Sequence, residues 1–246
     1  MTQISSAARE FRRRVADEAA FLETCDGGDA GSPARPSIWL MGIEPGWSLS
    51  DEKRAVSEGA SARLRQYPID LQLGWRFNQN AFKLLAALDG QSPDEYRTFA
   101  KRAQPFVAGS TGYFKGNLFP EPFHKVKVWD AEAVEATGFS TKAEYQAWMR
   151  GTRFPVFKNW LKSCRPRLFI GVGSTFLFDF LHVTETQESP EEHRFEVNGH
   201  TKRVFVASGG LAPVAVIPHL SGGSNGLNGN LSIQRAAEHI RSKFEL

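Results

Sequence analysis

Short apolar runs alternate with amphipathic stretches along this chain. Four apolar runs are typical of buried strands, and they cover residues 37–41, 111–120, 167–173 and 214–217. Apolar positions at helical spacing, with capping residues and acidic first turns, predict helices over residues 6–25, 81–88, 92–103, 140–149, 156–163 and 233–244. Because these strands are separated by helices, the pattern predicts an α/β fold with a mainly parallel sheet.

Three further segments complete this outline. Residues 193–207 alternate around Asn198-Gly199, a dipeptide that favours a tight turn, so they predict a hairpin at the sheet edge. Residues 1–30 form an N-terminal helical segment, and the polar residues 47–74 are expected to be an insertion over the site. The chain has 246 residues, of which 41% are hydrophobic, and we expect a single domain over residues 1–246.

Two of the predicted strands end in side chains capable of chemistry. Residues 37–41 run into the turn Gly-Ile-Glu-Pro-Gly, in which the proline restricts the backbone and fixes the direction of Glu44. The strand at residues 214–217 delivers His219 to a loop rich in glycine, asparagine and serine. Because the carboxyl ends of parallel strands meet at one edge of a sheet, Glu44 and His219 could face one pocket. The loop after His219 could bind phosphate, or it could be a linker that only turns the chain.

Composition narrows the classes of protein. Thirty basic and 27 acidic side chains give a net charge of +3, which permits an anionic partner without requiring one. The two cysteines, Cys25 and Cys164, exclude a four-cysteine iron–sulfur cluster and favour a reducing compartment. With no leader pattern and no long apolar run, we expect a soluble cytoplasmic protein with no membrane partner. The histidines lack ligand-like spacing, so we expect neither a metal nor another cofactor.

The two strand-end motifs carry a family resemblance. The turn at residues 42–46 resembles the first motif of the uracil-DNA glycosylase superfamily, a Gly-x-Asp/Asn-Pro turn. Residues 219–222, His-Leu-Ser-Gly, resemble its second motif, His-Pro-Ser, and residues 224–228 resemble the Asn-Pro-Ser-Gly-Leu-Asn of the mismatch-specific branch. The resemblance spans residues 38–244 in organisation, while close similarity is confined to the motifs. It implies a three-layer α/β/α sandwich around a short, mainly parallel four-stranded sheet.

The resemblance also implies an activity. Such a protein is a monofunctional base-excision repair glycosylase, which flips uracil out of single- or double-stranded DNA and hydrolyses its N-glycosidic bond. Its partners would be uracil-containing DNA and free uracil as the product, and we expect it to act as a monomer. Glu44 would orient or deprotonate the attacking water, or act electrostatically on the positively charged sugar. His219 would hydrogen-bond the departing base.

Binding roles follow from the same resemblance. Asn117, at the end of the second strand, would read the uracil edge, because a carboxamide offers a donor beside an acceptor. Ile43 would contact the base, and either Trp75 or Phe77 would stack on it, although both aromatics could equally be core residues. A further set of residues would contact the DNA phosphates or supply the apolar wedge that fills the vacated stack: Gly46, Leu220, Ser221, Gly222, Gly223, Ser224, Asn225 and Leu227. Leu220 and Leu227 are the alternatives for the wedge.

Three residues depart from the family pattern. Glu44 replaces an aspartate or asparagine, and Leu220 replaces a proline. Gly46 stands where the most uracil-restricted branch has a bulky tyrosine, so we expect a looser pocket that also accepts other deaminated or modified bases. Two other functions stay open. One is a noncatalytic relative that binds damaged DNA, and the other is an unrelated α/β enzyme acting on a nucleotide or phosphate ester.

Overall fold

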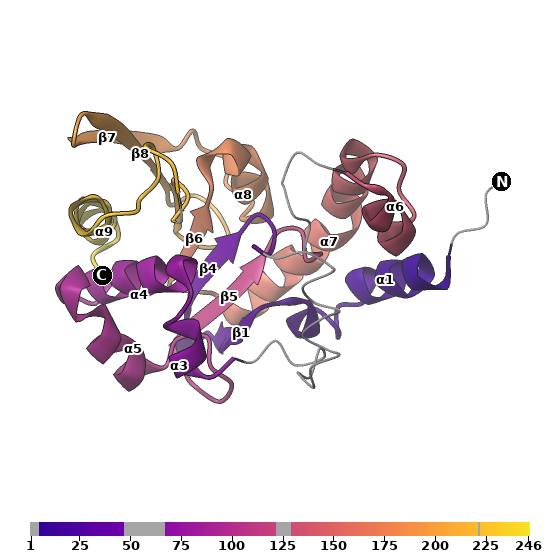
Figure 1. The fold of residues 1–246 in the computed structure, drawn as a ribbon, viewed down its shortest axis with the longest axis horizontal. Coiled ribbons are helices and arrows are strands. Elements are labelled where there is room, and N and C mark those ends of the chain that lie inside the picture. The colour runs from indigo at the N-terminus through magenta and orange to yellow at the C-terminus, as the bar shows by residue number, and fades with distance from the viewer. Residues whose placement is uncertain (1–4, 47–66, 122–128, 221) are drawn as a thin grey trace.

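The computed structural model describes residues 5–46, 67–121, 129–220 and 222–246. Within these ranges the strands are β1 (Gly27–Gly28), β2 (Gly31–Ser32), β3 (Arg35–Pro36), β4 (Ile38–Gly42), β5 (Tyr113–Asn117), β6 (Leu168–Val172), β7 (Glu191–Val197), β8 (His200–Ala207) and β9 (Val214–Ile217). The α-helices are α1 (Ser6–Ala16), α3 (Ile69–Gln72), α4 (Arg76–Leu88), α5 (Tyr96–Ala103), α6 (Ala131–Thr137), α7 (Lys142–Cys164), α8 (Leu177–Val183) and α9 (Asn230–Phe244). The chain is therefore an α/β protein (Figure 1).

The main sheet has seven strands in the order β1-β5-β4-β6-β9-β8-β7. The four central strands, β5, β4, β6 and β9, run parallel to one another. The predicted hairpin of β7 and β8 pairs antiparallel with β9, and β7 is an edge strand as expected. At the other edge β1 pairs antiparallel with β5. The sheet thus has seven strands rather than the four expected, because the hairpin and the short strand β1 extend its parallel centre.

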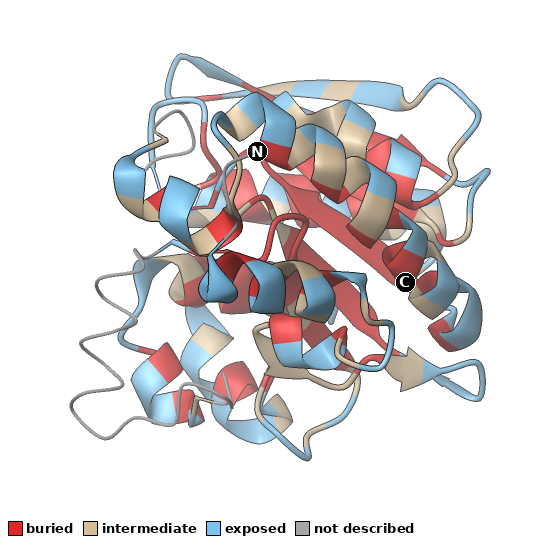
Figure 2. Ribbon diagram, turned by 90° about the vertical axis from the view of Figure 1, so that its right-hand side faces the viewer, coloured by how far each residue is buried: buried red, intermediate tan, exposed pale blue. Residues whose placement is uncertain are grey.

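Apolar residues of the central strands pack on both faces of the sheet. In β4, Ile38 and Leu40 belong to a hydrophobic cluster that includes α4, α5 and α9. Trp39 and Met41 alternate with them and belong to a second cluster, which includes α1, α7 and α8. Figure 2 shows buried strands, in red, between helices whose outward faces are exposed. Helices therefore cover both faces of the sheet, which gives the molecule three layers.

Several predicted helices have different boundaries. The first helix ends at Ala16 rather than near residue 25, because Asp17 is extended and its side chain accepts a hydrogen bond from the backbone of Ala19. The helices expected over residues 140–149 and 156–163 form one helix, α7, that runs through Pro155. Phe154 and Phe157 beside this proline are fully buried, and their packing offsets the missing N–H.

The described structure covers only part of the expected insertion at residues 47–74. Residues 47–66 lie outside the described residues, and the remainder contains the short helix α3. Two helices of the structure, α6 and α8, were not predicted, and α4 begins five residues before the predicted helix, at Arg76. No helix in the described parts of the chain is long and apolar enough to cross a membrane.

Candidate active site

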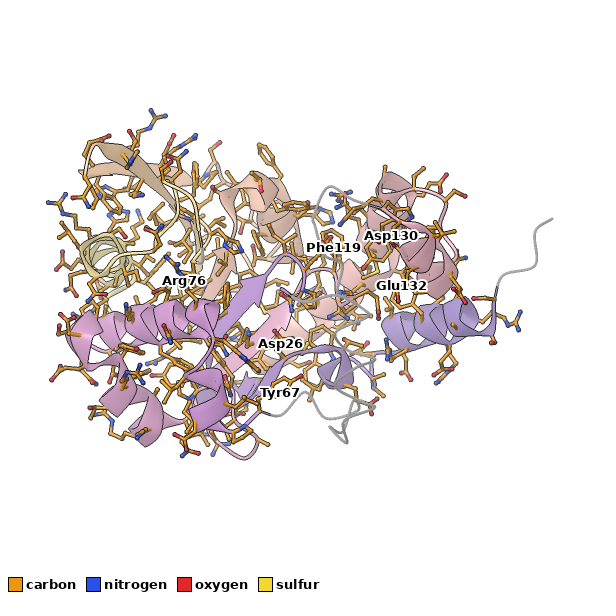
Figure 3. The ribbon with its side chains drawn as sticks, in the orientation of Figure 1. Asp26, Tyr67, Arg76, Phe119, Asp130 and Glu132 are labelled. Atoms are coloured by element: carbon orange, nitrogen blue, oxygen red, sulfur yellow. The ribbon has the colours of Figure 1, made fainter. Side chains whose placement is uncertain are left out.

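A cavity of about 590 Å³ lies at the carboxyl edge of the parallel strands. β4 supplies Glu44 just beyond its end, β5 ends at Asn117, and β9 is followed by His219. All three side chains line the cavity, although they are far apart in the sequence. Figure 3 labels three further lining residues, Asp26, Tyr67 and Arg76. The convergence expected from parallel strand ends is therefore present in this structure.

Glu44 is buried beside a lysine that the sequence analysis did not single out. Only 2% of its side chain is exposed, and Nζ of Lys142 lies 2.9 Å from its Oε2. Burial raises the pKa of Glu44 by removing water from the carboxylate, while the hydrogen bond and charge of Lys142 act in the opposite direction. Oε1 of Glu44 is buried and has no hydrogen-bond partner among the described residues. Oε1 is thus the oxygen of Glu44 that Lys142 does not engage.

Backbone hydrogen bonds hold the turn that carries Glu44. The pairing of β4 with β5 continues past both strand ends, because Leu118 donates to the carbonyl of Gly42 at 3.0 Å. Phe119 likewise donates to the carbonyl of Ile43 at 2.9 Å. Glu44 therefore leaves the sheet in a fixed direction, as the proline after it also requires.

His219 lies at the mouth of the cavity. Its side chain is exposed, yet the protein around the imidazole lowers its pKa through partial loss of hydration. The ring of Phe77 lies 5.8 Å from the imidazole ring, centroid to centroid. An imidazole with a lowered pKa is neutral at pH 7, and a neutral ring donates one hydrogen bond without carrying a charge.

Asn117 is buried at the end of β5, with 4% of its surface exposed. Its Nδ2 donates to Oδ2 of Asp26 at 3.2 Å. A Cβ atom at Gly42 would lie only 2.4 Å from Oδ1 of Asn117. The first glycine of the turn therefore makes room for the carboxamide, a packing reason that the sequence alone does not reveal.

The remaining base-contact candidates also line the cavity. Trp75 is 37% exposed, and its ring stands edge-on to Tyr67 at 4.9 Å. Phe77 is half-buried and lies near both His219 and Lys115, whose Nζ is 5.1 Å from the centre of its ring. Ile43 is 9% exposed, and no described residue other than its neighbour in the chain has an atom within 4 Å of the position that a Cβ of Gly46 would take.

The loop after His219 differs from the cavity residues. Leu220 and Leu227, the two candidates for a DNA wedge, are fully buried in the cluster beneath α4 and α9. The amide of Leu227 donates to the carbonyl of His219 at 2.9 Å, which closes the loop on itself. Neither leucine is exposed to DNA in this conformation, because both complete the apolar core.

The tip of this loop faces solvent. Gly222, Gly223, Ser224 and Asn225 are exposed and do not line the cavity, and Ser221 lies outside the described residues. Nζ of the buried Lys202 donates to the carbonyls of Ser224 and Gly226, the latter at 2.9 Å. These hydrogen bonds from Lys202 fix the backbone at the buried side of the loop, while its tip remains exposed.

Several polar lining residues were missed from the sequence. Lys115 and Asn117 are two positions apart in β5, so the strand period places both on the same face, and this was the available signal. Asp26, Gln72 and Asn78 come from other segments, and their approach depends on tertiary packing. Lys142 begins α7, and its position after the helix cap gives no indication of its contact with Glu44.

Comparisons with known proteins add no family assignment. No model of a known protein family matches the chain, and a search of curated proteins finds no matching relative. Within the described ranges, no group of three or more histidine, cysteine, aspartate or glutamate residues could hold a metal ion. What is established is an α/β protein with a mixed sheet and, at the carboxyl edge of its parallel strands, a cavity lined by both polar and apolar residues.

Proposed function

We propose that this protein is a monofunctional DNA glycosylase of the uracil-DNA glycosylase type, which removes uracil from single- and double-stranded DNA. One observation carries the proposal: Glu44, Asn117 and His219 come from three separate strand ends and line one cavity. The resemblance assigns these positions to the water, the base edge and the leaving group. The four parallel central strands and the helices on both faces are compatible with the fold that the resemblance implies.

The chemistry needs stabilisation at both ends of the breaking bond. As the base departs, the sugar gains positive charge and the base gains negative charge. Glu44 would stabilise the sugar and orient the attacking water through Oε1, while Oε2 is held by Lys142. His219 would donate a hydrogen bond to the uracil O2 from a neutral ring, which suits an imidazole with a lowered pKa.

Base recognition would use the Asn117 carboxamide and an aromatic ring of the cavity lining. Asn117 would bind the O4 and N3–H edge of uracil, and Phe77 would stack on the base because it lies beside both His219 and Lys115. Trp75 stands at a more exposed position and is the second candidate for stacking. The room that the described residues leave beside Gly46 supports tolerance for other deaminated or modified bases.

DNA backbone contacts would come from the exposed loop tip at residues 222–225, whose glycines leave backbone N–H groups accessible. Ser221 belongs to the same motif. A wedge function for Leu220 or Leu227 would require the loop to leave the conformation described above.

The test uses an end-labelled oligonucleotide with one uracil, incubated without added metal and then treated with hot alkali. We expect wild-type protein to cause strand breakage at the uracil. Glu44→Ala and His219→Ala should each lower the rate by about 10² to 10³, the usual cost of losing one group that stabilises a transition state. Glu238→Ala on α9 and His200→Ala on β8 change exposed residues outside the cavity, and they should retain full activity.

Each other outcome favours a different function. Tight binding of the oligonucleotide by wild type without breakage would favour the noncatalytic damaged-DNA binder. Competition by free nucleotides, with no affinity for DNA, would favour an unrelated α/β enzyme acting on a nucleotide or phosphate ester. If Glu44→Ala and His219→Ala both retain strand breakage at the uracil, neither residue takes part in the mechanism.

A further inference from the structure

A continuous row of hydrogen-bonded side chains lines one wall of the cavity. Nζ of Lys115 stands at its centre, 3.2 Å from Oδ2 of Asp26 and 3.0 Å from Oδ1 of Asn78. At one end, Nδ2 of Asn117 donates to the same oxygen of Asp26. At the other, Nδ2 of Asn78 donates to Oε1 of Gln72 at 3.0 Å. All five residues line the cavity.

Lys115 determines the direction of every bond on its Asn78 side. An ammonium group only donates hydrogen bonds, so the amide oxygen of Asn78 must face it. The amino group of Asn78 is then turned toward Gln72 and donates to the oxygen of that side chain. Gln72 in turn donates its Nε2 to the carbonyl of Tyr67 at 2.7 Å. One charged group thus fixes two carboxamides that could otherwise be turned either way.

The same reasoning applies to Asn117 on the other side of Lys115. An ionised carboxylate only accepts hydrogen bonds, so Asp26 requires the amino group of Asn117 to face it. A carboxamide turned by 180° would place its oxygen against Oδ2 of Asp26, where two acceptors repel. The backbone N–H of Asp26 donates to the carbonyl of Lys115 at 2.9 Å, which holds the aspartate beside β5.

We propose that Asp26, held by Lys115, is a positioning residue that fixes the Asn117 carboxamide and so selects uracil over cytosine; this inference rests on the proposed function. With one N–H bound to Asp26, Asn117 keeps its second N–H and its oxygen for the base. This pair complements an acceptor beside an N–H donor, the pattern of the uracil edge. Cytosine presents an amino donor beside an acceptor, which would fit the turned carboxamide instead.

Two variants of Asp26 test the inference. Asp26→Leu has a similar size but offers no acceptor to Asn117, and Asp26→Ser presents a hydroxyl that both donates and accepts. We expect each folded variant to reduce the preference for uracil over cytosine by about tenfold or more, the worth of one hydrogen bond. Asp70→Asn makes the same charge change at an exposed position of α3 outside the cavity, and its preference should equal that of wild type.

Preference is measured in two ways, so that the site and the reaction are tested separately. The first is single-turnover release of uracil and of cytosine from matched single-stranded oligonucleotides. The second is binding of the free bases uracil and cytosine, followed by ligand-observed NMR. If wild-type protein binds free uracil more tightly than free cytosine but releases no uracil from DNA, the proposed reaction is wrong. The Asp26 variants would then still test the inference through binding of the free bases.

The outcomes are distinct. Loss of preference in a folded Asp26 variant supports the positioning role, particularly if overall uracil binding falls by less than the preference does. An unchanged preference in both Asp26 variants overturns the inference while the glycosylase activity stands. If wild-type protein shows no preference between uracil and cytosine in either release or binding, the inference about Asp26 is overturned. The proposed recognition of the base by Asn117 is then overturned as well.

Discussion

Nζ of Lys142 lies 2.9 Å from Oε2 of Glu44, although the two residues are 98 positions apart in the sequence. Only 12% of the lysine side chain and 2% of the glutamate side chain are exposed. Pairs this deeply buried are screened far less than surface pairs. The lysine therefore favours the ionised form of the candidate catalytic carboxylate, against the larger opposing effect of burial.

The first prediction concerns the pH dependence of uracil release. Burial raises the pKa of Glu44 and Lys142 opposes that rise, so Lys142→Met should raise the pKa further. Activity that needs ionised Glu44 falls as the pH drops through this pKa. The acidic limb of kcat/KM against pH should therefore move to higher pH in the variant.

Lys142→Arg retains the charge and should leave the acidic limb close to that of wild type. Lys162→Met, which changes a half-exposed lysine near the other end of α7, should not move it. An acidic limb that stays in place in Lys142→Met would show that Glu44 is not the group that titrates in the profile.

A second prediction concerns Gly42, whose Cβ would meet the Asn117 oxygen at 2.4 Å. Gly42→Ala should displace that carboxamide and lower uracil release by about 10²-fold, because a shift of about 1 Å in a positioned group is this costly. Overpacking should also reduce the free energy of unfolding by about 1–3 kcal/mol. Single-turnover kinetics and denaturant unfolding measure the two effects. Gly151→Ala, whose added methyl group would meet no atom of another described segment within 4 Å, serves as the matched control.

The third prediction concerns the range of bases. Gly46 lines the cavity, and no described residue other than its neighbour in the chain comes within 4 Å of a Cβ added there, so Gly46→Tyr should place its ring in the pocket and narrow it. We expect the variant to retain uracil release while losing release of bases with bulky groups at carbon 5. A panel of oligonucleotides with modified pyrimidines measures this range, and an identical range in wild type and variant would contradict the prediction.

The fourth prediction separates a core role from a wedge role in the loop after His219. Leu227 is fully buried, so Leu227→Ala should lower the free energy of unfolding by about 2–5 kcal/mol, as for other buried leucines. Leu231→Ala removes the same atoms from a half-exposed position on α9 and should cost much less. Denaturant unfolding gives both values. A Leu227→Ala protein of unchanged stability that fails only on double-stranded DNA would instead support a wedge.

The sequence by itself determined features that depend on neighbouring residues. The apolar runs predicted the four central strands, and β9 was predicted with its observed bounds. Asn198-Gly199 predicted the hairpin turn, and both residues have the positive φ that such a turn requires, 52° and 73°. The glycine and proline around Glu44 predicted a rigid turn at a strand end. Because the ends of parallel strands converge, the sequence also predicted that Glu44, Asn117 and His219 lie at the same edge of the sheet.

Only the tertiary structure decided features that depend on contacts between distant segments. The sequence around Pro155 predicted two helices, yet burial of the flanking phenylalanines keeps α7 continuous. Leu220 and Leu227 lie in a polar loop, and only the packing beneath α4 and α9 identifies them as core residues. Lys142 and Asp26 reach the site because α7 and the segment before β1 are placed there by long-range packing, which has no local signature in the chain.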